Sequence, residues 1–167
     1  MFDEEELTGT DARLRAAELF RRAYEAQAEK NYAEAVELYR RSIATYPTAE
    51  AHTFLGWVYS FDGRYTDAID ECLKAISVDP TFGNPYNDIG SYLIAQGDLW
   101  TCVRWFRRAL AAPRYESYAF PHFNLGRVYE ERQRPLDAAR HYGHALEEQP
   151  GFTQAARALR RVQARLN

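Results

Sequence analysis

The stretch "HTFLGWVYSFDGRYTDAIDECLKAISVDP", residues 52–80, holds two segments of helical length separated by Asp62-Gly63. Its apolar residues recur at spacings of three and four, which predicts two amphipathic helices. A glycine after a helical segment is typical of a helix C-terminus, because glycine adopts a positive φ at little cost. The stretch therefore predicts a helix hairpin that turns at Asp62-Gly63 and ends near Pro80.

The same pattern occurs in three further segments, residues 19–47, 86–114 and 122–150, so the chain contains an internal repeat. The repeats share a Leu-Gly or Ile-Gly pair in the first helix, a small and then a bulkier residue in the second helix, and a closing proline. These positions are Leu55-Gly56, Ile89-Gly90 and Leu125-Gly126; Ala35, Ala68, Cys102 and Ala138; Tyr39, Cys72, Phe106 and Tyr142; and Pro47, Pro80, Pro113 and Pro150. We expect the small residues to let paired helices approach closely and the larger ones to fill the space between repeats.

Residues typical of turns and of helix N-termini occur where the division into four repeats requires them. The turns are predicted at Lys30-Asn31, Asp62-Gly63, Gln96-Gly97 and Gln133-Arg134. Prolines occur at the predicted helix starts, where a missing N–H costs nothing; these are Pro85, Pro121 and Pro135.

The Leu-Gly-x-x-Tyr motif, the small residue and aromatic of the second helix and the closing proline resemble the tetratricopeptide repeat (TPR) family over about residues 16–150. The resemblance implies an all-α fold, a right-handed α-solenoid of four helix pairs (about 16–47, 49–80, 83–115 and 119–150). It also implies a capping helix within 151–167 and a concave groove that binds a peptide or protein segment. Residues 1–10 are predicted to be an acidic N-terminal arm.

Three features depart from the family pattern. The first repeat has Arg22-Ala23 in place of Leu-Gly, which suits a terminal repeat. His52 and His122 replace the large aromatic near the start of the first helix, and we expect them to be packing groups. Two extra residues lie in "AAPRYESYAF", residues 111–120, and this loop could alter the pitch of the superhelix or act as a contact element.

Composition bounds the class of protein. The 167 residues suffice for one globular domain, and 46% hydrophobic content argues against disorder. No apolar run is long enough to span a membrane. The acidic start argues against a secretory signal, and Cys72 and Cys102 fit buried reduced thiols, so we expect a cytoplasmic protein without membrane association.

The net charge of −3 hides an asymmetry. Residues 1–100 carry a net charge of −9, whereas residues 101–167 carry +6, entirely through arginine. This polarity could steer an acidic partner or favour head-to-tail self-contact, and it also suits an ordinary solvated surface. Phe2 and Leu7 in the arm "FDEEEL" make self-association through residues 1–10 one testable alternative.

One group of aromatic residues is not explained by the repeat. Leu55, Gly56 and Tyr59 share a helix face that matches the pairing pattern, whereas Phe54, Trp57 and Phe61 form a second stripe on roughly the opposite face. In the family arrangement that face lines the groove, although neighbouring first helices could also cover part of it. The corresponding faces of all four repeats give the predicted partner-binding groove: Phe20, Tyr24, Phe54, Trp57, Phe61, Asn84, Asn87, Asp88, Ser91, Phe120, Phe123, Asn124 and Arg127.

Other kinds of site find little support. His141-x-x-His144 lies on a second helix and fits packing or surface histidines better than a metal site. One tetratricopeptide subfamily grips C-terminal carboxylates of heat-shock chaperones, but the matching positions lack its cationic set. We find no catalytic constellation or phosphate loop, so we expect no enzyme activity, cofactor or metal, and nucleic-acid binding is disfavoured.

The sequence therefore predicts a non-catalytic protein–protein interaction adaptor or scaffold that binds a peptide or protein segment in its groove. Two alternatives stay open. One is a secretion-type or assembly chaperone for a specific client, and the other is a self-assembling structural scaffold.

Overall fold

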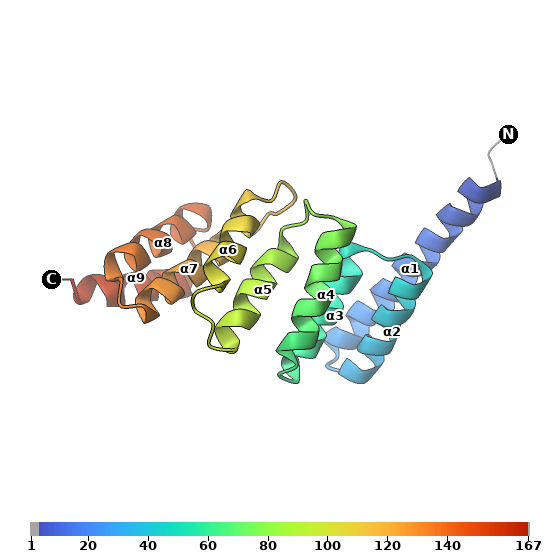
Figure 1. Ribbon diagram of the computed structural model, residues 1–167, viewed down its shortest axis with the longest axis horizontal. Coiled ribbons are helices and arrows are strands. Elements are labelled where there is room, and N and C mark those ends of the chain that lie inside the picture. Colours follow the sequence, from blue (N-terminus) through green and yellow to red (C-terminus); the bar gives the residue numbers. More distant parts are fainter. Residues whose placement is uncertain (1–3, 167) are drawn as a thin grey trace. The chain divides into compact units, whose positions relative to one another are not determined.

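The computed structural model describes residues 4–166, with side chains described from residue 9 onward, and this part of the chain forms nine helices and no strand (Figure 1). The chain divides into two compact units, the first ending at Pro80 and the second beginning at Thr81. The all-α fold class of stacked helix pairs, predicted from the sequence, is confirmed.

The first unit contains two antiparallel helix pairs. They are α1 (Glu4–Ala28) with α2 (Tyr32–Thr45), and α3 (Ala49–Phe61) with α4 (Tyr65–Val78). Thr48 starts α3 as its N-cap, since its hydroxyl accepts a hydrogen bond from the backbone N–H of Ala51 at 3.1 Å. Within α1 and α2, the buried Tyr39 hydroxyl donates to Gln27 and the Ser42 hydroxyl donates to the carbonyl of Ala16.

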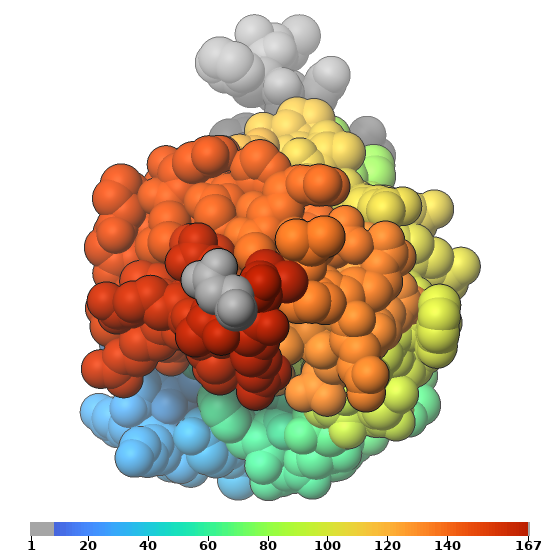
Figure 2. Space-filling model, turned by 90° about the vertical axis from the view of Figure 1, so that its left-hand side faces the viewer, coloured from blue at the N-terminus to red at the C-terminus, as the bar shows by residue number. Residues whose placement is uncertain are grey.

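The second unit also contains two pairs, followed by a single helix. The pairs are α5 (Asn84–Ala95) with α6 (Cys102–Ala111), and α7 (Ala119–Glu131) with α8 (Pro135–Glu148); the last helix is α9 (Thr153–Ala164). Figure 2 views this unit from its C-terminal end, where α9 (red) lies against α7 and α8 (orange). Ala155, Ala158 and Val162 form the buried face of α9.

The small and bulky positions of the repeat are buried. The bulky residues were predicted to fill the space between repeats, but Phe106 and Tyr142 pack inside their own helix pairs, against Gly90 and Gly126. All eight side chains are fully buried: Ala35, Ala68, Cys102, Ala138, Tyr39, Cys72, Phe106 and Tyr142. The glycines of the first helices make this packing possible. A Cβ added at Gly90 would lie 2.6 Å from the Phe106 ring, and one at Gly126 would lie 2.5 Å from Tyr142. The aromatic rings of α6 and α8 thus occupy space that only a glycine leaves free.

The four predicted turns are present, but only two of them use glycine. Gly63 and Gly97 have φ values of 70° and 84°, in the left-handed region. In the first and last pairs the same conformation is adopted by Lys30 (φ 62°) and Gln133 (φ 56°).

The structure adds detail at two places, the N-terminal residues and the loop with the two extra residues. Residues 4–10 belong to α1 instead of forming a separate arm, and residues 1–3 lie outside the described residues. The loop with the two extra residues folds back on the segment before α5, because Arg114 N–H donates to the carbonyl of Thr81 and Gly83 N–H donates to Arg114. Tyr115 is buried against Gly83, so the loop has a packing role within the second unit.

Within the described part of the chain, none of the helices combines the length and apolar character that crossing a membrane requires.

Candidate functional site

The predicted aromatic residues of the first unit form one continuous strip across α1 and α3. The ring of Phe54 lies 5.4 Å from that of Phe20 and 5.7 Å from that of Tyr24, both on α1. Along α3, Phe54 contacts Trp57, and Trp57 contacts Phe61 at 5.0 Å between ring centroids. These are tilted and edge-to-face contacts, which aromatic rings favour over direct face-to-face stacking.

The strip has a supported interior and an exposed edge. Phe20 and Phe54 are half-buried, because both also contact the buried ring of Tyr39 on α2. Tyr24, Trp57 and Phe61 remain 51%, 42% and 47% exposed. The expectation that a neighbouring first helix covers part of the stripe therefore holds for Phe54, while the other α3 aromatics stay accessible to a ligand.

Two aromatic residues of α2 support the strip. Tyr32, at the start of α2, stacks on Phe61 with ring centroids 4.8 Å apart and an interplanar angle of 22°. Tyr39 supports Phe20 and Phe54 from below, which agrees with the prediction that this bulky residue fills the space between repeats. Tyr32 was not among the predicted groove residues, because the groove was predicted from the faces of the first helices.

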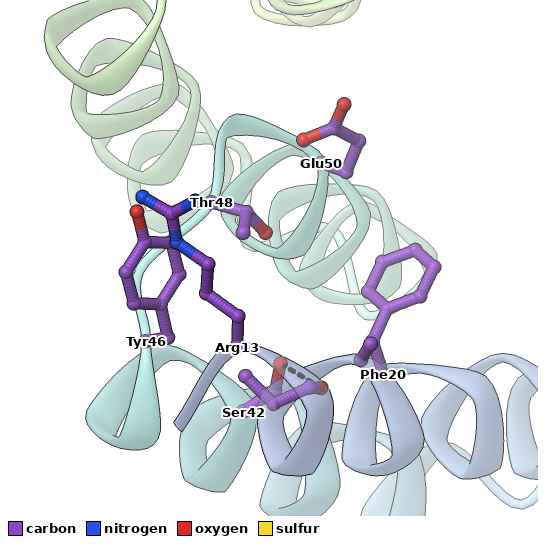
Figure 3. Close-up of a pocket in the computed structure, with 8 residues that line it drawn as sticks. Arg13, Phe20, Ser42, Tyr46, Thr48 and Glu50 are labelled. Carbon is purple, nitrogen blue, oxygen red and sulfur yellow. Dashed lines mark hydrogen bonds between the residues drawn. The ribbon is translucent and has the colours of Figure 1, made fainter. Parts of the chain in front are cut away.

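A cavity of about 480 Å³ adjoins the Phe20 end of the strip (Figure 3). It lies between α1, the end of α2 and the start of α3, with Phe20 on one side and Arg13 and Tyr46 on the other. The Arg13 guanidinium lies 5.0 Å from the centre of the Tyr46 ring. The cavity thus adds one cationic group next to an otherwise apolar aromatic surface.

The predicted polar residues of the second unit form a hydrogen-bonded cluster on α5 and α7. The amide nitrogen of Asn124 donates to Asn87 Oδ1 and to Ser91 Oγ, both at 3.3 Å. Arg127 in turn donates to Asn124 Oδ1 at 3.4 Å. Asn124 is only 8% exposed, so its amide positions Asn87, Ser91 and Arg127 and has little surface of its own to offer.

Asp88 is the unusual acid of this cluster. Burial raises its pKa to about 7, and the hydrogen bond from Asn87 Nδ2 at 3.4 Å only partly opposes this rise. The carboxyl group therefore exchanges between its neutral and charged forms near pH 7, and the neutral form can donate a hydrogen bond. The pKa of the neighbouring Tyr115 is raised chiefly by the burial of that tyrosine and, to a smaller extent, by the negative charge of Asp88.

The remaining predicted residues lie elsewhere in the second unit. Phe120, 45% exposed, and the half-buried Phe123 both contact Phe152, the residue before α9, with ring centroids 5.4 and 4.9 Å apart. Asn84 lies at the start of α5 and borders a separate cavity of about 350 Å³ next to Tyr115. Of the thirteen predicted residues, five therefore form the aromatic strip of the first unit and three lie apart from both groups. The other five form the polar α5–α7 surface of the second unit: Asn87, Asp88, Ser91, Asn124 and Arg127.

The histidines are packing groups, as expected. His52 is buried and its Nδ1 lies 2.6 Å from Glu71 Oε2. His122 and His141 face each other with their Nδ1 atoms 3.2 Å apart, and the ring of His144 lies 5.2 Å from that of His122. Within the described residues, no group of histidine, cysteine and acidic side chains could hold a metal ion.

Acidification is expected to destabilise the fold through this cluster. Burial, then the neighbouring histidines, lowers the pKa of His141 to about 4; burial and His144 also lower the pKa of His122. Both stabilising contributions are complete above about pH 6.5 and are lost as the pH falls toward 4, because the unfolded chain takes up protons first.

We expect a decrease of roughly 1–2 kcal/mol in the free energy of unfolding between pH 8 and pH 5, measured by urea denaturation. His141→Phe should make this decrease smaller. His144→Phe should reduce it to a lesser extent, because His144 is more exposed and acts on the other two histidines only through its charge. Equal pH dependence of all three proteins would contradict the assignment.

Comparison with known proteins agrees with this architecture. Residues 49–82, the α3–α4 pair and the turn after it, match the tetratricopeptide repeat family model. Over 97 residues the chain is 26% identical to the Small glutamine-rich tetratricopeptide repeat-containing protein 2 of Mycosarcoma maydis. That match covers 58% of this chain but only 28% of the fungal protein.

Solved structures show the same fold. The pilF protein of Pseudomonas aeruginosa superposes with a TM-score of 0.84 at 19% identity, covering 93% of this chain and 69% of that one. The first tetratricopeptide domain of Spaghetti (RPAP3), solved with the HSP90 peptide SRMEEVD, gives a TM-score of 0.65 at 24% identity, covering 71% of this chain and 93% of that one.

The helix pairs, their glycine-aromatic packing and these matches define an all-α helix-repeat protein. One of these helix pairs matches the tetratricopeptide repeat model, and the other pairs repeat its small and bulky positions, so the described part of the chain has the fold of a tetratricopeptide repeat array.

Proposed function

We propose that the protein is a non-catalytic adaptor that captures a segment of a partner protein on its first helices. The observation that carries the proposal is the aromatic strip, in which Tyr24, Trp57 and Phe61 each leave roughly half of their surface exposed. Three large aromatics on one surface approach the size of the apolar patches that usually mark interaction sites. The packing of the helix pairs does not require them, since the pairing positions lie on the opposite face of α3.

The strip is suited to side chains of a ligand more than to its backbone. Its rings are held by one another and by Tyr39, so little conformational entropy is lost when a ligand covers them. The α5–α7 surface is suited to polar contacts, since Asn87, Ser91 and Asp88 keep partly accessible groups that can donate and accept hydrogen bonds. A protein of similar fold also supports peptide binding, because the Spaghetti domain was solved with a bound peptide.

Trp57→Ala is expected to weaken partner binding at least tenfold, because a central exposed tryptophan is the residue type that most often dominates an interface. The measurement is titration of a partner segment, selected from a displayed peptide library on the wild-type protein, against both proteins. Trp100→Ala is the matched control, since Trp100 is 77% exposed but lies after α5, in the second unit.

Full affinity in Trp57→Ala, with normal helical circular dichroism, would refute the role of the strip. A loss of equal size in Trp100→Ala would show that the effect is not specific to the strip.

Self-association is the second candidate, favoured by the opposite net charges of residues 1–100 and 101–167. Head-to-tail contact would place the acidic residues 1–10 of one copy against the arginines of another. Light scattering at low and high salt, with and without residues 1–10, tests it. A monomer under all four conditions would exclude it.

A further inference from the structure

The last three helices line an open cavity on the surface of the second unit. It has a volume of about 520 Å³ and lies between α7, α8 and α9. Phe123 supplies its aromatic surface, and the buried ring of Tyr142 lies behind it with ring centroids 5.7 Å apart. Arg127 of α7 and Arg157 and Arg161 of α9 supply three guanidinium groups.

The aromatic side of this cavity is fixed by the repeat itself. Gly126 leaves the space that the Tyr142 ring occupies, and Tyr142 is fully buried. The Tyr142 hydroxyl donates to Glu130 Oε2 at 2.9 Å, and Phe123 is held between Tyr142 and Phe152. The cavity therefore has a preformed apolar wall.

One carboxylate fixes the position of α9 relative to this wall. Glu130 on α7 accepts hydrogen bonds from Arg161 Nε at 2.9 Å and Nη2 at 2.7 Å, as well as from Arg165 at 3.3 Å. Arg161, followed by the effects of Tyr142 and Arg165, holds the pKa of Glu130 below its usual range in spite of burial. Glu130 therefore stays charged at neutral pH and anchors the capping helix.

The other two arginines of the cavity have no carboxylate partner among the described residues. Among residues 9–166, the Arg127 side chain donates only to the neutral amide of Asn124, and the Arg157 side chain makes no ion pair or hydrogen bond. With Arg165, which also binds Glu130, four arginines and one glutamate surround the site. The local charge of the site is therefore strongly positive. Guanidinium groups next to an aromatic wall are suited to a carboxylate with a neighbouring apolar side chain.

We infer that the α7–α9 cavity binds an acidic segment of a partner protein, one in which glutamate or aspartate residues flank an aromatic side chain. The inference deepens the proposed function, on which it rests, by naming the chemistry of the partner. The aromatic side chain packs on the half-buried Phe123, which Tyr142 supports from the interior, and the carboxylates bridge Arg127 and Arg157. Carboxylate side chains suffice, so a free C-terminus is not needed.

The test uses the full chain and a fluorescent peptide with phenylalanine between pairs of glutamates, acetylated and amidated at its ends. Arg127→Gln combined with Arg157→Gln should weaken binding about tenfold, since each exposed arginine–carboxylate bridge contributes up to a few-fold. Neither substitution removes an ion pair that holds the fold. Arg160→Gln is the matched control, an exposed arginine of the same helix outside the cavity.

Binding should also fall when the salt concentration is raised and when the glutamates are replaced by glutamine. Equal binding of the glutamine peptide, or unchanged binding by the double variant, would overturn the inference. So would competition by a single-stranded oligonucleotide with the same arginine dependence, or self-association of the wild type that the double variant abolishes.

Trp57→Ala should leave binding of this short peptide unchanged, because Trp57 belongs to the first unit. A failure of the acidic-peptide test therefore leaves the aromatic strip and its own test unaffected.

Discussion

Phe106→Ala is expected to lower the free energy of unfolding of the second unit by about 3–5 kcal/mol. Phe106 is completely buried between α5 and α6, and its ring fills the space left by Gly90. Removing the ring leaves a cavity that the rigid helix backbones cannot close, so the lost burial and the lost packing both contribute. Urea denaturation followed by circular dichroism gives the change directly.

The control for this prediction is Leu136→Ala in the same unit. Leu136 is 69% exposed, so its truncation should change the stability by no more than about 0.5 kcal/mol. Since total stabilities are often about 5–15 kcal/mol, Phe106→Ala could unfold the unit outright. Phe106→Leu, which keeps most of the volume, should then give a smaller measurable loss. Similar losses for Phe106→Ala and Leu136→Ala would contradict the packing argument.

Glu71→Ala is expected to lower the free energy of unfolding of the first unit by about 3 kcal/mol. The carboxylate is buried on α4 and accepts from His52 Nδ1 on α3 and from Lys74 Nζ, each at 2.6 Å. Its removal leaves the buried His52 ring without this partner. Glu37→Ala, at an exposed position of α2, is the comparison and should be nearly neutral.

The same site should respond to acid. Burial acts to raise the pKa of Glu71, but hydrogen bonds from His52 and Lys74 outweigh it, and the pKa lies below its usual value. The stabilisation by this carboxylate is therefore complete above about pH 4.5 and is lost as the pH falls through the lowered pKa. Denaturation curves at pH 6 and pH 3 should show the wild type approaching Glu71→Gln in acid. A constant difference would mean that the charge of Glu71 is not involved.

The helix pairs could be predicted because their packing depends on residue size at fixed spacings. Gly90 and Phe106, or Gly126 and Tyr142, are complementary, so their recurrence in the sequence carries the geometry with it. The turn positions followed from the same repeat, even at Lys30 and Gln133, where the residue type alone does not favour a positive φ.

The surfaces were harder to predict. Helical periodicity tells which face of its own helix a side chain lies on, but it does not tell which residues of a neighbouring helix cover that side chain. Asn124 points toward α5, where Asn87 and Ser91 take up its hydrogen bonds, so it is buried. Phe54 is likewise partly covered by α1 and α2. The sequence singles out Arg157 only as one of several C-terminal arginines that could bind phosphate. Its place beside Phe123 and Arg127 depends on how α9 packs on the last pair, and the repeat alignment does not include α9.

The separation of faces on α3 has a consequence for how such a protein diverges over generations. Leu55, Gly56 and Tyr59 hold the helix in place, while Trp57 lies on its other side against the rings of Phe54 and Phe61. We therefore expect Trp57 to be exchanged with little loss of fold. Phe54 contacts both α1 and α2 and Phe61 stacks on Tyr32 of α2, so we expect these two aromatics to drift more slowly than Trp57.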